Sequence, residues 1–358
     1  MKKNMKKRLS LIMVILLGFL SFPVQAADIS NDSEGIKFLR YEYSRNVSDE
    51  VWANMTYPEK IAEYAISDSI LDQMTTEQIV QAVMDYPFLV DLTLFNTFEE
   101  GYNHVVECCD ALQELEQRPD GFIKLIEYYN DMPVPLSENS TDTEIIELLF
   151  AEILISNMAK KSNITGEQLA DFVDIIEAKQ EEMSKNPEIY GSIPSLEVVN
   201  TYSVNASYTT HTVTTLKGKN VTVIHYLSDF TTAEKNAENI AYSNAYPNST
   251  ILGTTTRNYN CASYAMINRS TSNIYWLNDL SPTNAGYTRL GFGLGYAAVG
   301  RIIYYANSES PGSHVGYVHS NYNGNLTVRS KMGFGPLVQH NYQDCPYYNA
   351  DTDLIFYN

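Results

Sequence analysis

The chain of 358 residues contains only four cysteines, Cys108, Cys109, Cys261 and Cys345. Exported proteins that depend on disulfides have a much higher cysteine density, so this scarcity excludes a disulfide-stapled scaffold. Cys108 and Cys109 are adjacent, and a bond between neighbours is strained, so we expect both to be buried helix residues. Cys261 and Cys345 could form a disulfide or remain free thiols.

Basic residues are also few. Lys and Arg number 24 against 43 Asp and Glu, which gives a formal net charge of −19. Such a surface disfavours nucleic acid and anionic lipid as partners. Of the six histidines, His211 and His225 lie 14 residues apart without an acidic or thiol partner at zinc-ligand spacing. The sequence therefore predicts no metal and no cofactor.

Only one long apolar run is present, at the N-terminus. The basic stretch "MKKNMKKR" precedes the apolar "LSLIMVILLGFLSF", and Val24 and Ala26 stand where signal peptidase requires small residues. We expect residues 1–26 to be a cleaved signal peptide; the alternative is a retained N-terminal anchor. Cleavage removes five basic and no acidic residues, which lowers the formal net charge to −24. With no second long apolar run and no cysteine directly after the first, we expect neither a membrane segment nor a lipoprotein anchor in the mature chain.

Residues 27–190 are predicted to be a helical domain. "TTEQIVQAVMDY" has apolar residues on one helix face, and capping-box patterns begin at Thr75, Thr141 and Thr165. The only histidine here, His104, is expected to have a core or surface role. "KNPEIYGSIPS" then ends the helical pattern.

Residues 191–358 are predicted to be a second domain of α+β class. "TTHTVTTLKGKNVTVIHYL" is typical of a hairpin, and "TTAEKNAENIAYSNAYP" predicts a helix that stops before Pro247. Short strands and glycine-rich turns follow. We expect an antiparallel sheet with a helix packed on it.

Cys261 stands at the start of a predicted helix, in "NYNCASYA", with Asn258 or Asn260 as its cap. Backbone N–H groups and the helix dipole at this position favour a thiolate, and the amide of Cys261 could stabilise an oxyanion. His314, in "PGSHVGYVHS", begins a predicted strand 53 residues later and is the candidate general base. His319 lies five residues on, which places it on the opposite strand face.

These motifs carry a family resemblance. "NYNCASYA", "GRIIYYANSESPGSHVGYV" and "LTVRSKMGFGPLVQHNYQDCPYY" resemble secreted bacterial papain-like hydrolases of the NlpC/P60 and CHAP type. The helical region before them resembles a module that precedes such domains in a clostridial-type subgroup. The resemblance implies a papain-like fold and a thiol peptidase or amidase that is secreted or bound to the cell surface. It also implies Cys261 as nucleophile, His314 as base, and a peptide or peptidoglycan substrate.

The third catalytic residue is less closely specified. The family carries a polar residue on the strand after the histidine, which makes Ser330 the first candidate, with His340 and Asp344 behind it. Lys331 would face away from the site, and it has no acceptor for an imidazole N–H. Arg301 and Met332 depart from the family pattern. They leave open the alternative that the protein is a catalytically degenerate hydrolase that only binds a surface. A transglutaminase-like acyl transferase is a further alternative, because it uses the same dyad.

Overall fold

The computed structural model describes residues 40–135, 142–161, 166–186, 189, 208–307, 312–322 and 324–358. The predicted signal peptide, the predicted domain boundary at residue 190, and the capping boxes at Thr141 and Thr165 lie outside these residues. The described part of the chain combines helices, which come first, with antiparallel sheets, which come second. This arrangement confirms the mixed helix and sheet content expected from the sequence.

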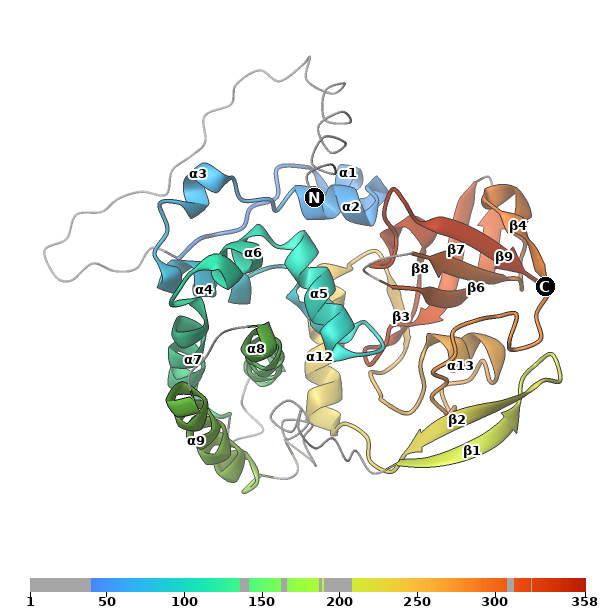
Figure 1. Ribbon diagram of the computed structural model, residues 1–358. Coiled ribbons are helices and arrows are strands. Elements are labelled where there is room, and N and C mark those ends of the chain that lie inside the picture. Colours follow the sequence, from blue (N-terminus) through green and yellow to red (C-terminus); the bar gives the residue numbers. More distant parts are fainter. Residues whose placement is uncertain are drawn as a thin grey trace, which may run out of the picture. The chain divides into compact units, whose positions relative to one another are not determined.

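The first part is helical (Figure 1). Its helices are α1 (Asp49–Asn54), α2 (Tyr57–Ala62), α3 (Asp68–Leu71), α4 (Thr76–Met84), the 3-10 helix η1 (Leu89–Thr93), α5 (Phe98–Cys108), α6 (Asp110–Gln117), α7 (Gly121–Asp131), α8 (Asp142–Lys161) and α9 (Gly166–Met183). The capping box predicted at Thr75 is confirmed: its hydroxyl accepts from the Gln78 amide, and the Gln78 side chain accepts from the Thr75 amide. The apolar face of α4 is buried, as its sequence pattern predicts.

The second part begins with a hairpin of β1 (Tyr208–Thr214) and β2 (Asn220–Tyr226), which confirms the prediction for that segment. Gly218 has φ 77° in its turn, a conformation that favours glycine. The larger sheet has the order β3-β8-β7-β6-β5-β9-β4. Its strands are β3 (Thr250–Gly253), β4 (Arg289–Phe292), β5 (Ile302–Ala306), β6 (His314–Tyr322), β7 (Asn325–Lys331), β8 (Leu337–Asn341) and β9 (Asp353–Tyr357), joined in antiparallel pairs.

Two helices of the second part position the candidate site. The predicted helix before Pro247 is α12 (Thr232–Ala245), and it packs against α8 and η1. The cysteine-bearing helix is α13 (Cys261–Met266), which packs on β6 and β7. Both lie next to the strands in Figure 1. Two further 3-10 turns are η2 (Leu294–Tyr296) and η3 (Tyr342–Asp344).

The seven-stranded sheet has different neighbours on its two faces. Val315 and Ile302 pack in one apolar cluster with Cys261 and other residues of α13. Tyr305 and Val318 belong instead to the large core that includes the helical part. Because side chains alternate along a strand, adjacent residues of β6 point into different clusters.

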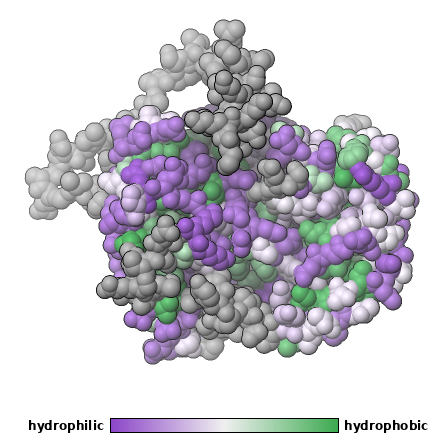
Figure 2. Space-filling model, viewed as in Figure 1, coloured by the Kyte–Doolittle hydropathy of each residue, from purple (hydrophilic) through white to green (hydrophobic). Residues whose placement is uncertain are grey.

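Residues Leu39–Asn358 form one compact unit, and one hydrophobic core runs through both its helical and its strand-rich parts. The coloured surface in Figure 2 is largely hydrophilic, with apolar side chains in scattered groups. None of the helices in the described ranges combines the length and the apolar character needed to cross a membrane.

Candidate functional site

Cys261 is the first residue of α13, as the sequence predicts, and Asn260 rather than Asn258 caps the helix. The Asn260 side chain accepts from the Ser263 amide at 3.1 Å and from the Leu277 amide at 3.3 Å. Its amide group donates to the Leu277 carbonyl at 2.9 Å. These contacts fix the point at which the helix begins, and therefore the position of the thiol.

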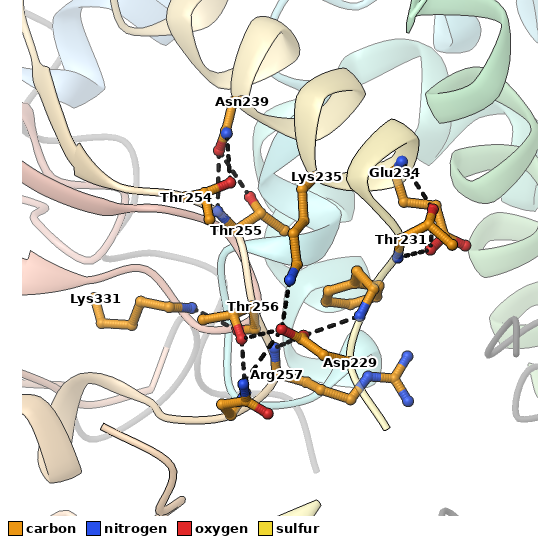
Figure 3. A network of polar contacts seen from close by, with 12 residues as sticks. Asp229, Thr231, Glu234, Lys235, Asn239, Thr254, Thr255, Thr256, Arg257 and Lys331 are labelled. Carbon is orange, nitrogen blue, oxygen red and sulfur yellow. Dashed lines mark hydrogen bonds and ion pairs between the residues drawn. The ribbon is translucent and has the colours of Figure 1, made fainter. Parts of the chain in front are cut away.

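The loop that leads into α13 is anchored by Asp229, which Figure 3 shows at the centre of a polar network. Its carboxylate pairs with Lys235 at 2.6 Å and accepts from the Thr256 hydroxyl at 2.7 Å and the Arg257 amide at 3.0 Å. Burial alone would raise the pKa of Asp229, but these hydrogen bonds hold it below its ordinary value. No local motif marks Asp229 in the sequence, because its partners lie up to 29 residues away.

Lys331 anchors the same loop from the sheet. Its ammonium donates to the Thr256 carbonyl at 2.9 Å and to the Gly333 carbonyl at 2.7 Å, and the side chain is fully buried (Figure 3). Burial lowers the pKa of Lys331 to about 7, against the opposing charges of Asp229, Glu238 and Cys261. As expected, Lys331 lies on the strand face opposite to Ser330. That face, however, is the one on which the cysteine-bearing helix α13 packs.

The Cys261 thiol has no solvent exposure. Burial raises its pKa to about 11, against the opposing effect of the backbone N–H groups of Val315 and Ala262, which point to the sulfur. The thiol therefore lies against the backbone of β6 at Val315, the residue that follows His314. All four cysteines are free thiols, so the alternative of a Cys261–Cys345 disulfide is wrong for this structure.

His314 is the first residue of β6, as predicted, and its side chain is fully buried. Its imidazole stacks on Tyr347, with ring centroids 4.3 Å apart, and lies beside Tyr305 at 5.7 Å. Among the residues that the structure describes, neither ring nitrogen has a hydrogen-bond partner, so the imidazole and the Cys261 thiol are not hydrogen bonded. Burial, and after it the neighbouring His340, lowers the pKa of His314 well below 6.5.

Ser330 does not orient His314 in this structure. Its hydroxyl is hydrogen bonded to Nε2 of His340 at 2.9 Å, while Nδ1 of His340 lies 2.7 Å from the Asn341 carbonyl. A carbonyl only accepts, so Nδ1 carries the proton and the Ser330 hydroxyl donates to Nε2. The physical reason is register: Ser330 packs beside Gly316, two residues beyond His314.

The remaining candidates have structural partners. Asp344 forms a buried ion pair with Lys60 of the helical part, at 2.5 Å. Arg301 donates to the Tyr296 carbonyl on the surface, and Met332 is fully buried. Among the residues that the structure describes, no group of three or more His, Cys, Asp or Glu side chains is arranged to hold a metal ion.

The helical part covers the candidate site. Asn96 accepts from the Asn260 amide group at 3.2 Å, and the Tyr347 hydroxyl donates to the Leu94 carbonyl at 3.1 Å. A side chain at Gly333 would lie 2.0 Å from the Phe95 carbonyl oxygen, so only glycine permits this approach. Residues 94–96 therefore lie close to the cap of α13 and to the ring that contacts His314.

Comparison of the chain with protein-family models, with curated proteins and with solved structures finds no match.

Proposed function

We propose that this protein is a cysteine hydrolase of papain-like type, with Cys261 as nucleophile and His314 as general base. One observation carries the proposal. A free thiol at the start of a helix lies against the strand residue that follows His314, whose two ring nitrogens are buried without a partner. An imidazole left unpaired in this way loses its hydration without compensation, which is characteristic of a group whose partner arrives during function.

In the proposed reaction the Cys261 sulfur attacks the carbonyl carbon of an amide, and His314 transfers the thiol proton to the leaving amine. The backbone N–H of Cys261, at the helix start, stabilises the oxyanion. Water then releases the acyl group from sulfur. The resemblance to NlpC/P60 and CHAP hydrolases makes peptides of peptidoglycan, or of a related cell-surface polymer, the proposed substrate.

The structure corresponds to a closed state in this proposal. With a thiol pKa of about 11 and an imidazole pKa well below 6.5, both groups are neutral at pH 7. His314 packs with Tyr305 and Tyr347, on the sheet face away from Val315 and α13. Reaction therefore requires that the imidazole leave this stack and that the start of β6 rearrange to bring it to the thiol. Substrate must also reach a site with no solvent exposure. Movement of residues 94–96 away from the cap of α13 would allow both changes.

The test is hydrolysis of peptidoglycan stem peptides, followed by mass spectrometry of the new ends. Cys261→Ala and His314→Asn should each reduce the rate by at least about a hundredfold. Cys345→Ala is the matched control, because Cys345 is also a fully buried free thiol of the same part of the chain. Full activity of Cys261→Ala would rule the mechanism out.

A degenerate hydrolase that only binds a surface polymer is the second candidate. The absence of a thiol–imidazole hydrogen bond and the complete burial of both groups favour it. In that case wild type and Cys261→Ala would bind peptidoglycan equally and release no peptide. Binding with no hydrolysis by wild type would replace the first proposal with this one.

A further inference from the structure

A second thiol and imidazole pair lies in the helical part. His104 and Cys108 are four residues apart on α5, a spacing that places both side chains on one helix face. The Cys108 sulfur is 3.7 Å from Nε2 of His104. Unlike Cys261, Cys108 is partly exposed to solvent. The expectation that Cys108 and Cys109 are both buried helix residues holds only in part. Cys108 is the last residue of α5 but is partly exposed, and Cys109 is buried but lies between α5 and α6.

The imidazole of this pair is held by a buried chain of hydrogen bonds. Nε2 of His104 lies 2.6 Å from the Tyr57 hydroxyl, and this hydroxyl donates to one carboxylate oxygen of Asp91. The other oxygen of Asp91 accepts from the Tyr246 hydroxyl at 2.6 Å. Because a carboxylate only accepts, Tyr57 uses its proton on Asp91 and must accept from Nε2. Nε2 of His104 therefore donates its proton to the Tyr57 hydroxyl oxygen, and the Cys108 sulfur lies 3.7 Å from the same nitrogen.

A cleft of about 300 Å³ opens onto the pair. His104 and Cys108 line it, together with apolar residues that include Pro58, Ile61 and Pro346. His104 is only 3% exposed, and its second ring nitrogen, Nδ1, is buried without a hydrogen-bond partner. A cleft lined by a partly exposed thiol and by an imidazole that has an unpaired ring nitrogen is an arrangement that packing alone does not explain.

The charges around the pair favour an imidazolium. Burial alone would lower the pKa of His104, but the neighbouring Cys108 and Asp91 raise it to about 10. An imidazolium 3.7 Å from a sulfur attracts the negative charge that develops on that sulfur when it reacts. The adjacent Cys109 differs, since it is 1% exposed and burial raises its pKa to about 12. The chain thus places a reactive candidate and an inert one side by side.

We propose that Cys108 is a thiol–disulfide exchange site that forms a mixed disulfide with a small disulfide entering this cleft. The Cys108 thiolate attacks one sulfur of the disulfide, a new sulfur–sulfur bond forms, and the original one breaks. The leaving thiolate takes a proton from water at this partly exposed position, which replaces the proton that Cys108 released to water, and departs as a free thiol. The small disulfide is the only oxidant consumed, and such compounds persist outside the cytosol, where the sequence predicts this chain to be.

The cleft also defines the charge of its ligand. Glu107 and Asp110 line it beside the thiol, and the chain as a whole carries a formal net charge of −19. A cationic disulfide is therefore attracted to the cleft, and an anionic one is repelled. Cystamine, a small dication, and dithiodipropionate, a dianion of the same length, are a matched pair of probes for this property.

The experiment follows modification of the native full chain by each probe, with peptide mass spectrometry to locate the adduct. Cystamine should modify Cys108 about tenfold faster than it modifies the thiols of the urea-unfolded chain, and much faster than dithiodipropionate does. Cys108→Ser should abolish the fast phase, while Cys109→Ser should retain it. His104→Gln should slow the phase about tenfold.

Several outcomes would overturn the proposal. If the fast phase survived in Cys108→Ser, or if mass spectrometry located the adduct on Cys109, the reactive thiol would not be Cys108. If His104→Gln does not fold, the comparison of native and unfolded wild type decides. A rate of cystamine modification at native Cys108 that is no higher than the rate for the unfolded chain would show that His104 does not activate the thiol. Equal rates for the two probes would remove the assignment to cationic disulfides.

Discussion

The imidazole of His314 lies flat on the ring of Tyr347, with centroids 4.3 Å apart and planes inclined by 17°. Tyr347 also contacts Phe95, at 4.4 Å, and donates its hydroxyl to the Leu94 carbonyl. One tyrosine therefore joins the candidate catalytic histidine to the helical part that covers it. Among the described residues, the histidine is positioned by ring packing and not by a hydrogen bond.

Replacing Tyr347 by leucine should destabilise the protein. The substitution removes the ring stack and the hydroxyl donor from a fully buried position, so we expect the free energy of unfolding to fall by about 2–4 kcal/mol. Urea denaturation measures this change. Tyr322→Leu is the control, because Tyr322 is 75% exposed and its loss should cost less than about 0.5 kcal/mol. Equal effects of the two substitutions would show that Tyr347 does not join the two parts.

Asn260→Ala should also destabilise the protein, by about 2–4 kcal/mol, because it removes a helix cap and leaves buried backbone groups of Leu277 unpaired. Asn258→Ala should cost less, since the Asn258 side chain makes one longer contact, 3.3 Å to Asp229. Thermal and urea unfolding of the two variants make the comparison. A smaller loss for Asn260→Ala than for Asn258→Ala would contradict the assignment of the cap.

The features that the sequence predicted correctly depend on neighbours close in the chain. The hairpin around Gly218, the helix before Pro247 and a cap directly before Cys261 each follow from a short pattern of turn, apolar and capping residues. The position of His314 at the start of a strand follows from the Pro-Gly turn and the alternation after it. In each case the interactions that form the element lie within a few residues of one another.

The features that could not be predicted depend on tertiary packing. The sequence does not specify that α13 packs on the face with Val315, which leaves His314 in the other cluster with Tyr305. Nor does it show that Ser330 lies opposite Gly316, because the pairing of β6 with β7 fixes that relationship. A one-residue change of register would move every side chain of a strand to the opposite face of the sheet. The face on which a residue lies therefore cannot be derived without knowing how the strands pair.

Lys331 should make stability depend on pH in the alkaline range. Its folded pKa of about 7 lies below its ordinary value of 10.5, so the unfolded chain binds more protons between these values and stability rises with pH there. Relative to Lys331→Met, the wild type should gain about 3 kcal/mol of unfolding free energy between pH 7 and about pH 9.5. Urea titrations at intermediate pH values measure the difference.

Lys235→Met is the control for this prediction, because Lys235 forms a partly exposed ion pair with Asp229 and not a buried contact with carbonyls. The difference between wild type and Lys235→Met should change little over the same pH range. Parallel pH profiles for wild type and Lys331→Met would mean that the Lys331 amine stays charged when buried.

Glu238 should have the opposite effect at lower pH. It is fully buried on α12 and hydrogen bonded to Thr93 of η1, and burial raises its pKa from 4.5 to about 7. The folded protein therefore binds the extra proton between these values, and stability falls as pH rises. Relative to Glu238→Gln, which keeps an acceptor for Thr93, the wild type should lose about 3 kcal/mol between pH 4.5 and 7.5. Glu99→Gln, on an exposed side chain, should show no such trend. The pH ranges over which Glu238 and Lys331 change stability meet only near pH 7, so one set of urea titrations separates the two effects. If the wild type gained stability relative to Glu238→Gln between pH 4.5 and 7.5, the prediction of a buried, protonated carboxyl would be contradicted.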